Sequence, residues 1–184
     1  MGRGWAALAL LCALAIPGRA YANPWLTIQW VPIVAPAQLV VHELSHAAMV
    51  EALGGRVTEI SFLSHGRFGT TGYAGIRPGM PTFAVSVAPR LLDIGEMLLF
   101  SALRDGTTNP HLRGLYDAVR ISAWADFEFN TCKIGYPEGP SDIAYGNDAW
   151  DTMHGLGLGS TEARVSSAVL AIGVGWFGFH WMFQ

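Results

Sequence analysis

Residues 41–57 read VHELSHAAMVEALGGRV, and this stretch predicts a helix that ends in two glycines. His42 and His46 are one helical turn apart, so a helix places both side chains on the same face. Gly54-Gly55 is typical of the end of a helix. Pro36 suits a first turn, where its missing N–H needs no partner. We therefore predict a helix from about Pro36 to Leu53, preceded by a kinked or extended apolar segment.

The same stretch predicts metal chemistry. Two imidazoles at this spacing can bind one zinc ion (Zn²⁺), and Glu43 lies about 100° around the helix, close enough to hold a water molecule at the metal. Zinc lowers the pKa of such a water, and Glu43 then acts as general base and returns the proton to the leaving amine. The pattern also occurs by chance on Glu-rich surface helices. Here its neighbours are apolar, and three buried ionisable groups without a metal would be costly.

The third zinc ligand is not adjacent to the motif. The longer H-E-x-x-H-x-x-G-x-x-H pattern requires Gly and His where Met49 and Ala52 stand. Glu59 comes too early for the glutamate that thermolysin-like enzymes carry about twenty residues downstream. His65 falls near that position, and a turn residue is the simpler interpretation. The common soluble zinc hydrolases are therefore poor fits.

The composition favours a membrane. Hydrophobic residues make up 51% of the chain and charged residues 14%, against about 25% charged in an ordinary soluble domain. The net charge is −3 and no basic run is present, so nucleic acid is not an expected partner. We expect the lipid bilayer to surround much of the apolar surface.

The N-terminus predicts a secretory signal. Arg3 precedes the apolar residues 6–16, and Ala20-Tyr21-Ala22 offers a small-x-small cleavage site. We predict a signal peptide over residues 1–22 and a membrane-embedded metalloprotease-like domain over 23–184. After cleavage Cys132 is the remaining cysteine, so no intrachain disulfide is expected.

Together with the motif helix, three further stretches predict a mainly α fold, a multi-pass transmembrane bundle of three or four spans. Residues 83–103 and 165–183 are candidate spans, and 115–129 predicts an amphipathic helix on or inside the bundle. Asp93, Glu96 and His180 are expected to face the bundle interior, because polar groups facing lipid are costly. Residues 57–62 alternate with period two, and 70–76 are β-prone and rich in glycine. These two runs predict a small β-hairpin after the motif helix.

With its glycine end, the basic Arg56 and the hairpin, this apolar HExxH helix resembles the site-2 protease class of intramembrane zinc metalloproteases, especially its small members. Ala88-Pro89 matches the internal proline of the following helix in that class. The resemblance covers about Pro36 to Leu103 and implies a distant aspartate as third ligand. The usual N-x-x-P…D-G segment is not present in clean form.

Two aspartates are candidates for that third ligand. Asp142 follows Gly139-Pro140-Ser141 and is the one we favour, with an ordinary helix N-cap as its alternative role. Asp148 is the second candidate. A carboxylate beside His42 and His46 would complete a catalytic zinc site with one open position.

The resemblance implies a zinc-dependent endopeptidase that cuts peptide bonds in or near the membrane, acting on a membrane protein or peptide. An edge strand of the hairpin could hold such a substrate extended. Two alternatives stay open. One is a membrane zinc hydrolase with a non-peptide or soluble substrate, and the other is a catalytically inactive binding or regulatory protein of the same fold.

Overall fold

The computed structural model describes residues 23–64, 67–132, 148, 152 and 156–183. The chain is mainly helical, with one two-stranded antiparallel hairpin, as the sequence predicts. The described elements, in chain order, are α2 (Pro24–Ile28), α3 (Val31–Ala52), β1 (Arg56–Ser64), β2 (Arg67–Ala74), α4 (Met80–Asp105), α5 (Pro110–Cys132) and α7 (Ser160–Phe183).

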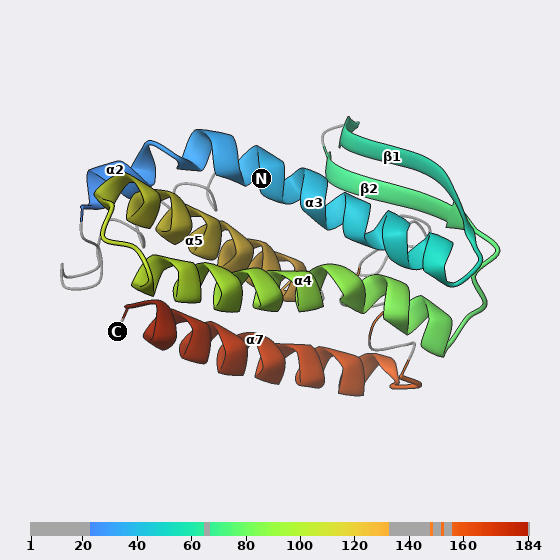
Figure 1. Cartoon of the computed structure of the whole chain (residues 1–184). Helices are drawn as coiled ribbons and strands as arrows, with labels where there is room; N and C mark the ends of the chain where they lie inside the picture. The colour runs from blue at the N-terminus through green and yellow to red at the C-terminus, as the bar shows by residue number, and fades with distance from the viewer. Residues whose placement is uncertain (1–22, 65–66, 133–147, 149–151, 153–155, 184) are drawn as a thin grey trace.

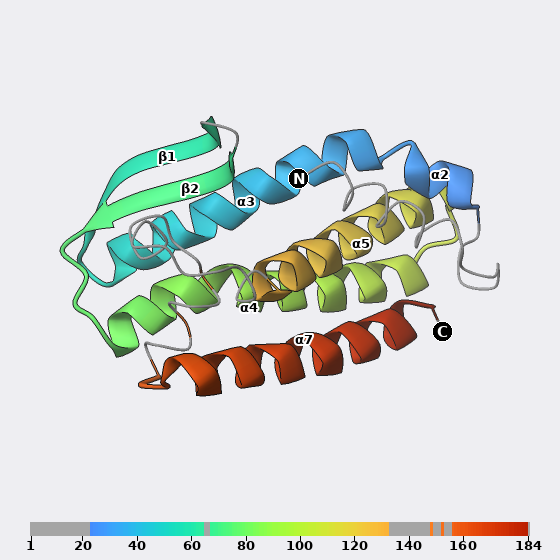
Figure 2. The same cartoon turned by 180° about the vertical axis from the view of Figure 1, so that it is seen from behind.

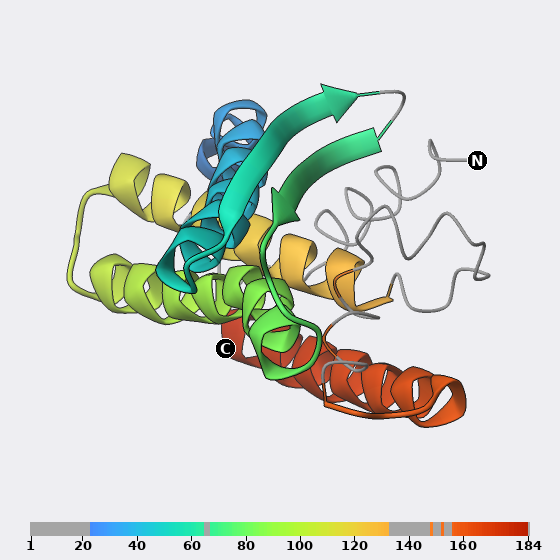
Figure 3. The same cartoon turned by 90° about the vertical axis from the view of Figure 1, so that its right-hand side faces the viewer.

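The long helices lie roughly side by side, and α5 is the helix against which the others pack (Figures 1 and 2). It packs against α2, α3, α4 and α7. Both strands of the hairpin pack on α3 instead, and Figure 3 shows them curving over the C-terminal part of that helix. The hairpin thus covers the half of α3 that carries the two histidines.

The motif helix begins earlier than the sequence suggested, at Val31 and not at Pro36. Pro32 occupies the first turn, where proline is well tolerated, and Pro36 then lies inside the helix at the cost of one backbone hydrogen bond. Part of the preceding apolar segment also forms a helix, α2, which Asn23 caps by accepting from the backbone N–H of Trp25. The predicted kinked segment is therefore largely helical.

The end of α3 follows the prediction closely. The backbone N–H of Gly54 donates to Glu51 and that of Gly55 to Val50, after the last helical residue Ala52. Gly54 adopts φ +76°, a conformation that favours glycine, so the chain can leave the helix and enter β1 directly. A side chain at Gly55 would collide with Ile76. Glycine at this position therefore lets the chain that follows the hairpin lie close to the helix end.

The hairpin pairs Arg56 with Ala74 at its open end and Ser64 with Arg67 at its closed end. The register shifts between Val57 and Glu59, where β1 bulges. Such a bulge increases the local twist of a strand pair, which fits the curvature of the hairpin over α3 (Figure 3).

Polar residues of the second long helix point inward, as predicted. Asp93 is 1% exposed, and Glu96 is half-buried. The side-chain amide of Gln38 donates to both carboxylates, at 2.9 Å and 2.7 Å. The same expectation is wrong for His180, which is exposed on α7 and stacks on Trp176.

Among the described residues, α3 is the helix that is long and apolar enough to cross a membrane. Its composition and its place near the N-terminus fit a membrane span and a signal sequence alike. The predicted signal peptide, residues 1–22, lies outside the described part of the chain.

Candidate metal centre

One turn of α3 supplies the centre of the site. His42, Glu43 and His46 are each at most 6% exposed, between α4, α5 and the hairpin. The two imidazole rings meet edge to face, with centroids 5.0 Å apart. The helical spacing therefore places two imidazole side chains side by side in the protein interior, as the sequence predicts.

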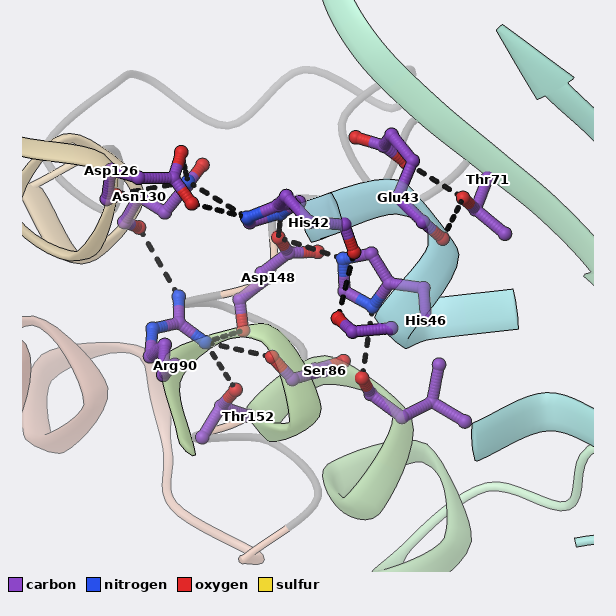
Figure 4. Close-up of polar contacts among 12 residues, drawn as sticks. His42, Glu43, His46, Thr71, Ser86, Arg90, Asp126, Asn130, Asp148 and Thr152 are labelled. Atoms are coloured by element: carbon purple, nitrogen blue, oxygen red, sulfur yellow. Dashed lines mark hydrogen bonds and ion pairs between the residues drawn. The ribbon is translucent and has the colours of Figure 1, made fainter. Parts of the chain in front are cut away.

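A third potential ligand comes from a distant part of the chain. The Nε2 atoms of His42 and His46 each lie 3.2 Å from the same oxygen, Oδ2 of Asp148 (Figure 4). The three side chains form a group that could hold one metal ion. Asp142, which the sequence analysis favours as third ligand, lies outside the described residues. The structure thus brings the second candidate, Asp148, to the two histidines.

The other nitrogen of each imidazole is already engaged. Nδ1–H of His42 donates to Oδ2 of Asp126 at 2.6 Å, and Nδ1–H of His46 donates to the backbone carbonyl of Val85 at 2.9 Å. Such outer partners fix the tautomer and ring orientation of metal-binding histidines. Both Nε2 atoms consequently face Asp148. They donate hydrogen bonds to its carboxylate when protonated and are free to bind a metal ion when deprotonated.

This donor set fits zinc. Tetrahedral sites with bonds of about 2.0–2.2 Å place neighbouring ligand atoms about 3.3–3.6 Å apart. The two separations from Asp148 Oδ2 to the histidine nitrogens, 3.2 Å each, lie close to the short end of that range. Two imidazoles and one carboxylate are also the ligand set of a catalytic zinc site, which keeps a fourth position for water or substrate.

The carboxyl group of Asp148 is suited to act as a ligand. Burial raises its pKa, but the positive charge of His46 and the hydrogen bonds from both imidazoles outweigh burial and hold the pKa well below its usual range. A metal-binding carboxyl group must be deprotonated. Asp148 therefore meets this requirement at neutral pH.

Glu43 is held by the hairpin. The hydroxyl of Thr71, on β2, donates to Oε2 of Glu43 at 2.7 Å and lies 3.1 Å from the backbone carbonyl of the same residue (Figure 4). Gly69, on the same strand, leaves room for the carboxylate: a Cβ there would lie 2.1 Å from Oε1 of Glu43. The strand thus determines where the Glu43 carboxylate can sit.

We expect Gly69→Ala to displace Glu43 and lower any hydrolytic activity by about 100-fold, the effect that a misplacement of about 1 Å can have. The substitution also places alanine at φ +70°, which costs about 1–3 kcal/mol of stability. Gly75→Ala is the matched control, because Gly75 has φ +84° and its added Cβ would, among the described residues, meet Gly55 alone, at an ordinary contact distance. Thermal unfolding and activity of the two variants check this: equal activities would contradict the role of Gly69.

Sequence reasoning did not single out two groups that support the site. Asp126 was visible only as one polar residue of an amphipathic helix, although Asn130, one turn later on α5, lies on the same face. The Asn130 amide donates to Oδ1 of Asp126 at 2.9 Å and so fixes the partner of His42. Thr71 gave no signal, because a threonine in a strand is common.

Comparison of the chain with models of known protein families, with curated proteins and with solved structures gives no match.

Proposed function

We propose that this protein is a zinc-dependent endopeptidase of the membrane, with His42, His46 and Asp148 as zinc ligands. One observation carries the proposal. Two histidines on one helical turn direct their Nε2 atoms at one carboxylate oxygen, at 3.2 Å each, and a buried glutamate lies on the same turn. That combination of ligands and base is the one that metal-assisted hydrolysis of peptide bonds requires.

The chain's own groups divide the work. When bound, zinc supplies Lewis-acid activation of a water molecule and of the substrate carbonyl. Glu43 takes the proton from the attacking water and delivers it to the nitrogen of the leaving amine. Thr71 holds the Glu43 carboxylate through its hydroxyl. Asp126 and the carbonyl of Val85 keep the two imidazoles oriented.

The hairpin provides a place for an extended substrate. A helical peptide bond must be unwound before attack, and pairing with a strand edge holds a peptide extended. β2 passes directly over Glu43 through Thr71 and Gly69, and in the described hairpin it pairs with β1 along one edge only. A substrate strand added to its other edge would run beside the site.

We further propose that the helices form a multi-pass membrane bundle. The apolar character of α3 supports this, and so do large apolar side chains that α4 and α7 expose. Long helices that each expose several large apolar side chains fit a lipid environment better than water. The strongly exposed examples are Leu91, Leu98, Leu99, Val165, Val169, Ile172 and Trp176.

The proposal is tested with the full chain purified in detergent. We expect cleavage of dye-labelled casein, a generic unfolded protein, or of an apolar helical peptide reconstituted in liposomes. Cleavage should stop on treatment with a strong chelator and return with zinc. Zinc-loaded protein that cleaves neither probe would contradict the peptidase and favour a binding or regulatory role. Cleavage of casein alone would contradict action on membrane helices.

A further inference from the structure

In the candidate metal centre, the Nδ1 atoms of the two histidines have different kinds of hydrogen-bond acceptor. His42 donates to a side chain, Asp126, whereas His46 donates to a backbone carbonyl in the interior of α4, that of Val85. A carbonyl inside a helix normally accepts from the N–H four residues later. A carbonyl that accepts from a side chain of another helix has usually lost its donor within its own helix.

Pro89 gives that reason. Residue 89 is the one whose N–H would bond Val85, and proline has no N–H. Its ring also pushes the carbonyl four residues earlier away from the helix. Pro89 is fully buried inside α4, so the freed carbonyl must find a donor in the protein. Nδ1–H of His46, at 2.9 Å, is that donor.

The residue after the proline reaches the third ligand. Arg90 is 4% exposed, and among the described residues its hydrogen bonds go to neutral oxygens. It lies 3.4 Å from the backbone carbonyl of Asp148 and donates to the hydroxyl of Thr152 at 3.0 Å (Figure 4). The other arm of its guanidinium donates to the carbonyl of Asn130 at 3.2 Å.

The guanidinium of Arg90, on α4, therefore contacts two other segments of the chain: the end of α5 and the segment that carries Asp148 and Thr152. Asn130 lies in the last turn of α5, where helix carbonyls lack partners of their own. Asp148 and Thr152 belong to the part of the chain that brings the third ligand. The carboxylate of Asp148, together with those of Asp93 and Asp126, stabilises the positive charge of the buried guanidinium. Arg90 is thus connected to Asp148 both through the backbone carbonyl and through charge.

We propose that residues 85–90 of α4 form a positioning element for the metal centre, in which Pro89 releases the Val85 carbonyl to orient His46 and Arg90 fixes the backbone of Asp148. Neither Pro89 nor Arg90 touches the metal or the substrate in this assignment. The inference rests on the zinc site proposed above. It adds that Pro89 inside this helix serves zinc affinity and not the stability of the bundle.

Pro89→Ala separates these two roles. Alanine restores the N–H to Val85 and removes a helix-breaking residue, so the metal-free protein should unfold at the wild-type temperature or above it. Zinc affinity, measured in detergent by competition with a chelator, should fall by about 10–100-fold, as for loss of other outer partners of zinc ligands. Pro81→Ala, in the first turn of the same helix, should change neither property. Wild-type zinc affinity in Pro89→Ala, or unfolding below the wild-type temperature, would overturn this part.

Arg90→Lys tests the second part of the proposal, that Arg90 fixes the backbone of Asp148. Lysine keeps the charge but loses the fork, so zinc affinity should again fall by about 10–100-fold. The visible spectrum of the cobalt-substituted protein should change, since it reports the geometry of the ligands. Thr152→Val removes only one acceptor and should shift affinity in the same direction. Arg120→Lys is the control, because Arg120 is equally buried but pairs with Asp117.

Two failures are distinguishable. Wild-type protein that binds no zinc would refute the zinc site itself. Zinc-loaded wild type, together with Arg90→Lys and Thr152→Val variants of unchanged affinity and spectrum, would refute only the positioning role of Arg90.

Discussion

Glu43→Gln is expected to lower hydrolysis by about 10²–10⁴-fold, the usual contribution of general acid–base catalysis, while zinc remains bound in full. Glutamine keeps the shape of the side chain and still accepts from the Thr71 hydroxyl, so the helix and hairpin should stay in place. It cannot take a proton from water. The variant should therefore separate metal binding from catalysis.

The measurement is turnover of dye-labelled casein or of the reconstituted helical peptide beside zinc content in the same preparation. Glu51→Gln is the control, since Glu51 is exposed on the same helix and accepts from the backbone N–H of Val57. Full activity in Glu43→Gln would show that the mechanism is wrong even if the zinc site is right. Loss of zinc together with activity would assign Glu43 to the metal instead of the water.

His46→Ala has the second large effect. Zinc sites with four protein ligands bind with about 10–16 kcal/mol, so one ligand is worth about 3 kcal/mol, or about 100-fold in affinity. The variant also leaves the Val85 carbonyl without its donor in a buried place. We expect zinc to be lost during purification and activity with it.

Chelator competition followed by metal analysis measures this loss. His111→Ala is the control, because the side chain of His111 is exposed at the start of α5. Zinc retained by His46→Ala at wild-type affinity would remove this residue from the site. An equal loss in His111→Ala would point to an indirect effect of the purification.

Much of the fold was predictable from local signals. The histidine spacing within an apolar stretch and the paired Gly54-Gly55 predicted the motif helix, and the alternation over 57–62 with the glycine-rich run 70–76 predicted the hairpin. The predicted start of the helix is wrong, because Pro32 and not Pro36 occupies the first turn. The inward position of Asp93 followed from the cost of exposing a charge in apolar surroundings. His180 does not follow this expectation, because it is exposed on α7 and stacks on Trp176.

The candidate site was predictable only where its residues are neighbours in sequence. His42, Glu43 and His46 share one turn, so their meeting follows from helix geometry. Asp126 and Asp148 come from elements whose approach to α3 depends on tertiary packing, which no spacing rule encodes. The choice of Asp142 rested on its resemblance to a ligand segment. That choice stays a prediction, while the observed contacts favour Asp148.

The proposed metal centre is tested by the zinc content of the full chain purified in detergent, measured for the wild type beside Asp148→Ala and Asp142→Ala. We predict one zinc ion per chain in the wild type, the same in Asp142→Ala, and loss of zinc in Asp148→Ala. A wild type without zinc would contradict the metal centre as a whole. Normal zinc in Asp148→Ala with loss in Asp142→Ala would contradict the ligand set proposed here.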